Sequence, residues 1–175
     1  MRLASIGGLA LATAIVLATS TSAAAQNLDL SAGYQGGGQL LNGGAQWNTF
    51  PAGWYVDLSS AVRPRIALVG EVGGVYESPN THEYSYQGGI RLFSSANPTL
   101  TPFAQALVGA STSGTSGSSM NAFSMQGGGG IDITPVHGLG IRIAADYQRV
   151  FFSDTNGGAQ NDIRIAIGAV FHVGK

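Results

Sequence analysis

The sequence predicts an all-β fold, an antiparallel up-and-down barrel of eight strands. Apolar residues recur at every second position, 27 of the 175 residues are glycine, and good helix formers seldom cluster. Most of the alternating segments have about ten residues, which is the length that a tilted strand needs to cross a bilayer. The eight segments run roughly over 28–34, 53–62, 66–76, 82–93, 101–111, 122–133, 140–150 and 160–173.

The first 25 residues have the pattern of a cleavable signal peptide. A positive Arg2 precedes an apolar stretch that ends near Ala18, and a short polar run then leads to three alanines that end at Ala25. This order of a charged start, an apolar core and a small-residue cleavage site is typical of export signals. We therefore expect residues 1–25 to be removed and residues 26–175 to form one barrel domain.

Composition excludes several classes of function. Only 10% of the residues are charged and the formal net charge is −1, so no basic field favours nucleic acid. The absence of cysteine excludes disulfides and thiolate metal sites. The three histidines, His82, His137 and His172, have no metal-ligand spacing. We expect neither a metal nor another cofactor.

The alternation separates an apolar face from a face that is small or charged. In the last segment Ile163 and Ile165 share one face, while Asp162 and Arg164 share the other. In four segments the charged residues lie an even number of positions apart, so they share one face of the strand. Arg149 is the exception, and it lies near the end of its segment, where it could snorkel or belong to a loop.

Two architectures fit this alternation, and they differ in which face meets water. In a soluble sandwich or barrel the polar face is solvated, and its ion pairs would be ordinary surface pairs. In a narrow eight-stranded membrane barrel the polar face lines the lumen, and small residues make room for paired charges. The scarcity of charges favours the membrane barrel. The expected interior charge network is Glu71, Glu83, Arg91, Asp132, Arg142, Asp146 and Arg164.

Aromatic residues near the segment ends suggest a girdle at the membrane interface. If both termini lie on the periplasmic side, most of these residues fall at the outer end and Phe171 falls at the inner end. Aromatics at such positions are also compatible with the core of a sandwich. The expected girdle is Tyr34, Trp54, Tyr76, Tyr84, Phe123, Tyr147 and Phe171.

The connections fit an up-and-down meander. Each of the inner turns, 63–65, 94–99 and 134–138, contains a proline, which interrupts a strand. The expected outer connections are 35–52, 77–81, 112–121 and 152–159. Three of these are long and rich in Gly, Ser and Asn.

With its signal peptide and eight alternating segments, the chain resembles the outer membrane protein β-barrel domain family, the OmpA/OmpX-type small barrel of Gram-negative bacteria. The segment TPFAQALVGA at 101–110 and the closing IRIAIGAVF from Ile163 to Phe171 carry the resemblance. It implies an outer-membrane location and a last strand whose terminal aromatic is read by the barrel-insertion machinery. This chain departs from that pattern, because Phe171 is followed by His172, Val173, Gly174 and Lys175.

Catalysis is not expected. Lipid-modifying barrels that resemble this chain need Ser, His and an acid at one rim, and His82 with Ser78, Glu83 and Ser85 is the only local candidate. His82 and Ser85 have opposite parity, which argues against a catalytic pair.

The sequence therefore predicts a monomeric, porin-like outer-membrane barrel without an open pore. Its role would be structural or a surface interaction with an unknown partner, and its expected contacts are outer-membrane lipid and the insertion machinery. A secreted or periplasmic barrel that binds a small apolar ligand is the first alternative, and a lipid-modifying barrel enzyme is the second.

Overall fold

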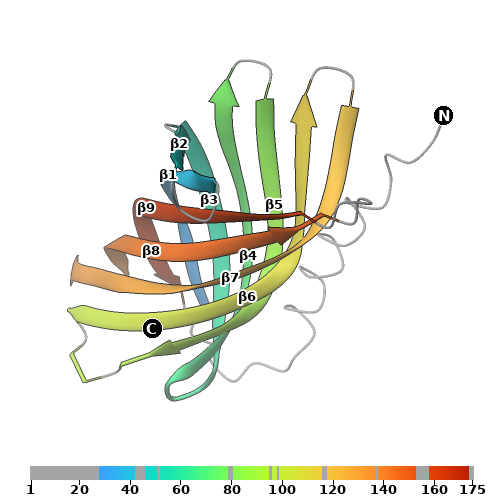
Figure 1. Cartoon of the computed structure of the whole chain (residues 1–175). Coiled ribbons are helices and arrows are strands. Elements are labelled where there is room, and N and C mark those ends of the chain that lie inside the picture. Colours follow the sequence, from blue (N-terminus) through green and yellow to red (C-terminus); the bar gives the residue numbers. More distant parts are fainter. Residues whose placement is uncertain are drawn as a thin grey trace.

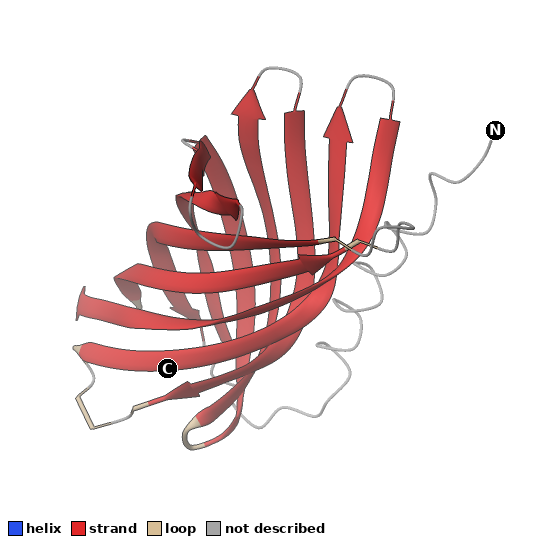
Figure 2. Ribbon diagram, in the orientation of Figure 1, coloured by secondary structure: helices blue, strands red, loops and turns tan. Residues whose placement is uncertain are grey.

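The computed structural model describes residues 28–41, 46–50, 52–78, 81–94, 96–97, 99–115, 118–136, 138–152 and 158–173. The expected signal peptide, residues 1–25, lies outside this part of the chain. All the regular elements described are strands (Figure 2). They are β1 Leu28–Leu41, β2 Gln46–Phe50, β3 Ala52–Arg63, β4 Ile66–Ser78, β5 Thr81–Phe93, β6 Leu100–Thr115, β7 Ser118–Val136, β8 Leu139–Phe151 and β9 Ala159–Val173.

The strands form a closed antiparallel barrel (Figure 1). From β3 to β9 each strand pairs with the next in the chain, and β1 pairs with both β3 and β9. Leu28 lies opposite Val173 in the closing pair, so the described ends of the chain meet at one end of the barrel. The predicted eight-stranded, up-and-down, all-β barrel is confirmed. No helix among the described residues is long and apolar enough to cross a membrane.

The ninth strand segment arises because the second barrel strand is interrupted. β2 pairs with the C-terminal part of β1, from Gly37 to Leu41, and β3 pairs with its N-terminal part, from Leu28 to Tyr34. Only Pro51 separates β2 from β3. Proline has no backbone N–H to donate to the ladder, so a break at this position is expected.

Two connections were wrongly predicted as long loops. Within the expected loop 35–52, β1 continues to Leu41 and β2 covers Gln46–Phe50. Within the expected loop 112–121, the β6–β7 ladder continues to Thr115 opposite Ser118. Backbone hydrogen bonds do not require apolar side chains, and the Thr112 hydroxyl adds a 2.7 Å hydrogen bond to the Asn121 side-chain oxygen. These Gly- and Ser-rich segments therefore extend the hairpins.

The β3–β4 turn lies where its proline predicted it, whereas Pro98 of the expected turn 94–99 lies outside the described residues. Pro64 and Arg65 form the turn between β3 and β4. β7 runs further than expected, to Val136, and its register to β8 shifts between Ile133 and Val136, around Pro135. The next described residue, Gly138, has a φ of 85°, a conformation that glycine adopts at little cost. His137 lies outside the described residues.

Candidate functional site

Buried polar and charged side chains line the barrel interior together with Tyr55, Phe103 and Leu107, whereas most large apolar side chains face outward. On β9, Asp162 and Arg164 are buried, while Ile163 and Ile165 are exposed by 38% and 60%. β8 alternates in the same way, as its burial pattern shows. Seven buried charged residues form an interior charge cluster: Asp57, Glu71, Arg91, Asp132, Arg142, Asp146 and Arg164.

The half of this cluster nearer the end of the barrel where Leu28 and Val173 pair is built around Asp57 on β3. Its carboxylate accepts hydrogen bonds from Arg91 on β5 and from Arg142 on β8. Arg142 also donates two hydrogen bonds of 2.7 Å to Asp132, its cross-strand neighbour on β7. The Phe103 ring lies against both guanidinium groups, with its centroid 4.6 Å from the Cζ of Arg91 and 5.0 Å from that of Arg142. Two arginines and two carboxylates thus balance in charge.

The other half of the cluster, nearer Glu83, is built around Arg164 on β9. Its guanidinium donates to Glu71 on β4 at 2.6 Å and to Asp146 on β8 at 2.7 Å. It also donates to the side-chain oxygen of Gln35 on β1 at 2.8 Å. Gln105 joins the two halves, because it accepts from Arg91 at 2.7 Å and donates to Asp146 at 3.0 Å. The network therefore spans the lumen from side to side.

Glu83 lies apart from this cluster. No arginine among the described residues pairs with it; instead Gln160 donates to it at 3.4 Å, and the same amide donates to Asp162 at 3.0 and 3.2 Å. Glu83 had been expected to share the arginines. The carboxylates nearer the middle of the lumen, Glu71 and Asp146, occupy Arg164 instead.

Asp57 is the cluster member that the sequence prediction omitted. It is 1% exposed and contacts two arginines. The signal for it was present, because Trp54, Val56 and Leu58 alternate with Tyr55 and Asp57 in the predicted segment 53–62. Parity alone would have placed its carboxylate in the interior with the others.

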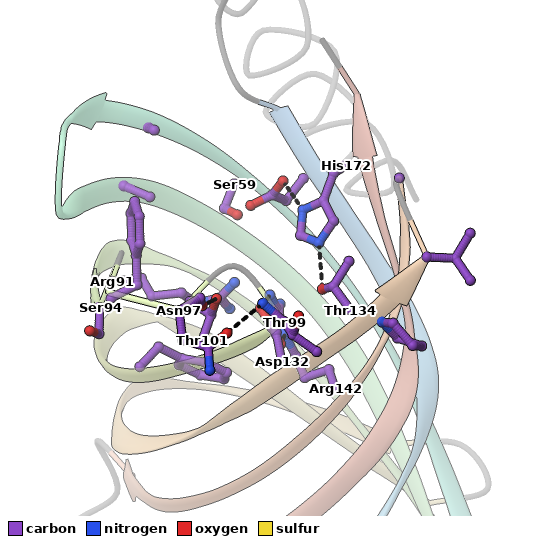
Figure 3. A pocket seen from close by; sticks show the side chains of 18 residues that line it. Ser59, Arg91, Ser94, Asn97, Thr99, Thr101, Asp132, Thr134, Arg142 and His172 are labelled. Atoms are coloured by element: carbon purple, nitrogen blue, oxygen red, sulfur yellow. Dashed lines mark hydrogen bonds and ion pairs between the residues drawn. The ribbon is translucent and has the colours of Figure 1, made fainter. Parts of the chain in front are cut away.

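The lumen is hollow at both ends of this cluster. A cavity of about 500 Å³ lies at the end of the barrel where Leu28 and Val173 pair, and it is lined by Arg91, Asp132, Arg142 and Thr134 among others (Figure 3). Smaller cavities of about 190 and 30 Å³ lie at the other end, near Glu83. The interior charge cluster lies between them.

His172 joins three strands at the rim of the larger cavity (Figure 3). Its Nδ1 lies 2.6 Å from the Asp29 carboxylate on β1, and its Nε2 lies 3.1 Å from the Thr134 hydroxyl on β7. Its backbone N–H donates to the carbonyl oxygen of Gly138. Asp29 and His172 are also paired residues in the β1–β9 ladder, so this contact ties the strands that close the barrel.

The aromatic residues expected in a girdle lie on the outer surface. Six are exposed and Tyr84 is half-buried. Trp54 donates to the Tyr76 hydroxyl at 3.3 Å, and the Tyr147 hydroxyl donates to Asn161 at 2.6 Å. The exposed members are Tyr34, Trp54, Tyr76, Phe123, Tyr147 and Phe171.

Among the described side chains, the candidate catalytic residues His82, Glu83 and Ser85 are not assembled into a triad. Ser85 is buried on the interior face, while the His82 ring packs at 5.2 Å from the ring of Tyr84, two residues further along the same face. Glu83 points to the interior with Ser85. The side chain of Ser78 lies outside the described residues.

Comparison with known proteins identifies the fold. Neisserial surface protein A matches with a TM-score of 0.60 over 86% of this chain and 99% of that protein, at 9% identity. The chain has the fold of a small outer-membrane β-barrel. The outer membrane protein OprG from Pseudomonas aeruginosa matches with a TM-score of 0.56 over 86% and 97% at 11% identity. Ail, the attachment invasion locus protein of Yersinia pestis, matches with a TM-score of 0.54 over 84% and 98% at 17% identity. No family model and no curated protein sequence matches the chain.

Proposed function

We propose that the protein is an outer-membrane β-barrel of a Gram-negative bacterium with a structural or surface-interaction role. The observation that carries the proposal is the inverted distribution of polarity. Leu68, Val108 and Ile165 are exposed by 55%, 55% and 60% on different strands, while arginines and carboxylates are buried in the interior. An apolar belt around a closed barrel is favourable in lipid and unfavourable in water. Outer-membrane lipid is therefore the first partner.

The similar structures support this location and role. Their names describe a surface protein, an outer membrane protein and an attachment invasion locus protein. We propose the same kind of role here: contribution to membrane integrity, or contact with a partner through the hairpins that extend from the barrel. The barrel-insertion machinery would read the last strand near Phe171, and the barrel would act as a monomer.

We further propose that the interior charge cluster closes the lumen to solutes. An eight-stranded barrel is just wide enough for its side chains to fill it. Arg164 reaches carboxylates on β4 and β8, and Arg142 reaches Asp57 on β3. These contacts cross the space that a solute would have to traverse. No catalytic step is part of the proposal, because His82 and Ser85 lie on opposite faces of β5.

Fractionation and conductance test the two parts of the proposal. The full chain expressed in a Gram-negative host should be found in the outer-membrane fraction, and recovery in the periplasm would contradict the location. In planar bilayers the purified protein should give no stable channels. Removal of the Glu71–Arg164 pair by the double substitution Glu71→Ala/Arg164→Ala should produce measurable conductance. Open channels from the unaltered protein would contradict a closed lumen.

A further inference from the structure

Arg149 is a cation on the outer surface of the barrel. It is exposed, and it belongs to the face of β8 that also carries Tyr147 and Ile143. Arg91, Arg142 and Arg164, which lie within strands, are buried in the interior and ion-paired, whereas Arg63 is exposed at the end of β3, beside the turn to β4. The ion pairs of the described residues do not include Arg149. A guanidinium stays charged in proteins, so the presence of this charge on the outer face of the barrel needs a physical explanation.

The height of Arg149 on the barrel places it at the edge of the apolar belt. The ten residue steps from Leu139 to Arg149 rise about 33 Å along a strand. A strand tilt of about 40° leaves about 25 Å along the barrel axis, which is the height of the apolar band of such barrels. If Leu139 marks the inner edge of that band, Arg149 lies at its outer edge, where lipid headgroups begin.

The surroundings of Arg149 hold its side chain and supply polar groups. Its Cζ lies 5.2 Å from the centroid of the Phe151 ring, which in turn packs 5.9 Å from the ring of Phe123. A guanidinium stacked on a ring keeps the donors at its edge available. Asn161 lies directly opposite Arg149 in the β8–β9 ladder and accepts a 2.6 Å hydrogen bond from the Tyr147 hydroxyl.

We propose that Arg149 binds the phosphate of an anionic lipid headgroup in the outer leaflet, with Phe151 as its platform and Asn161 as a neighbouring polar contact. This inference rests on the proposed membrane location. Phosphate fits the site because a guanidinium forms paired, charge-assisted hydrogen bonds with it. Tyr147, two residues nearer the middle of β8 on the same face, would lie against the upper part of the acyl chains of the same lipid.

Lipid retention by the purified, folded protein tests the inference. Native mass spectrometry compares phosphatidic acid with diacylglycerol of the same acyl chains, so that the phosphate is the only difference. The unaltered protein should retain phosphatidic acid preferentially. Arg149→Gln should reduce this preference about tenfold, the effect of losing one charge-assisted hydrogen bond. Arg65→Gln should keep the preference, because exposed Arg65 lies in a turn at the opposite end of the barrel.

Two results would overturn the inference. One is an equal preference for phosphatidic acid in Arg149→Gln and the unaltered protein. A second is displacement of the lipid by inorganic phosphate at matched ionic strength, which would make the free anion the ligand. Heat-dependent electrophoretic mobility of every variant shows that it has folded. If the unaltered protein itself fails to fold in detergent, the proposed function fails instead.

Discussion

Asp57 and Arg142 form an ion pair across the barrel lumen, joining β3 to β8, although 85 positions separate them in the sequence. Both side chains are almost completely buried, with exposures of 1% and 2%. A buried ion pair contributes little net stability, but removal of one partner leaves an uncompensated charge. The fold therefore depends on the cluster being complete.

Removal of Asp57 should destabilise the barrel strongly. In Asp57→Ala, Arg91 loses its carboxylate partner and Arg142 keeps only Asp132, so we expect the free energy of unfolding to fall by about 3–5 kcal/mol. Urea titration of the protein in lipid vesicles, followed by circular dichroism, measures the change. Ser59→Ala is the matched control, because Ser59 is buried on the same face of β3. Equal unfolding midpoints for the two variants would contradict the role of Asp57.

An arginine on the outer face should cost most at mid-height. Ile165→Arg places a charge on an exposed site in the middle of β9, and we expect a loss of about 2–4 kcal/mol if lipid surrounds it. Leu139→Arg, at the inner end of β8, should cost about 0–1 kcal/mol. The same titration in vesicles measures both. If water surrounds the barrel, neither variant should be destabilised.

The contact between Asp29 and His172 should stabilise the closing strand pair. His172→Ala removes the 2.6 Å contact with Asp29 and the 3.1 Å contact with Thr134. We expect a loss of about 1–3 kcal/mol and faster amide hydrogen exchange in β1 and β9 near this rim. Thr134→Val removes one of these contacts and should have the smaller effect. Unchanged amide hydrogen exchange in His172→Ala would show that this contact does not stabilise the pairing of β1 with β9.

Two glycines with different surroundings should respond differently to an added methyl group. A Cβ at Gly168 would lie 2.6 Å from the Tyr55 hydroxyl oxygen and still closer to the carbonyl oxygen of Ala32, whereas a Cβ at Gly127 would meet nothing within 4 Å. Gly168→Ala should therefore cost about 1–3 kcal/mol through overpacking, and Gly127→Ala should be nearly neutral. Unfolding titrations of both variants check this. A neutral Gly168→Ala would mean that the backbone relaxes at this pair.

The alternation of side chains was enough to predict the fold and the faces of its strands. Ile163 to Phe171 shows why: each residue's parity decides its face, and parity is a local property. The ends of the hairpins were not predictable in this way. Thr112 and Asn121 lie in Gly- and Ser-rich sequence that is typical of loops, yet they pair through their backbones in the β6–β7 ladder.

The partners within the interior charge cluster also could not be predicted from the sequence. Which carboxylate meets Arg164 depends on the stagger between strands on opposite sides of the barrel, here β4 and β9. That stagger is set when the whole sheet closes. For the same reason Glu83 could be placed on the interior face but could not be seen to lie beside Gln160 and Asp162, away from the arginines.

The central claim is that the outer face meets lipid and the polar face lines the lumen. The most direct test is to refold residues 26–175 into detergent micelles and, in parallel, into plain buffer, followed by circular dichroism and by electrophoresis with and without boiling. The account predicts a β spectrum and a heat-dependent mobility shift in detergent only. A folded, monodisperse protein in plain buffer would contradict it, because the exposed Ile163–Phe171 face could not then be surrounded by lipid.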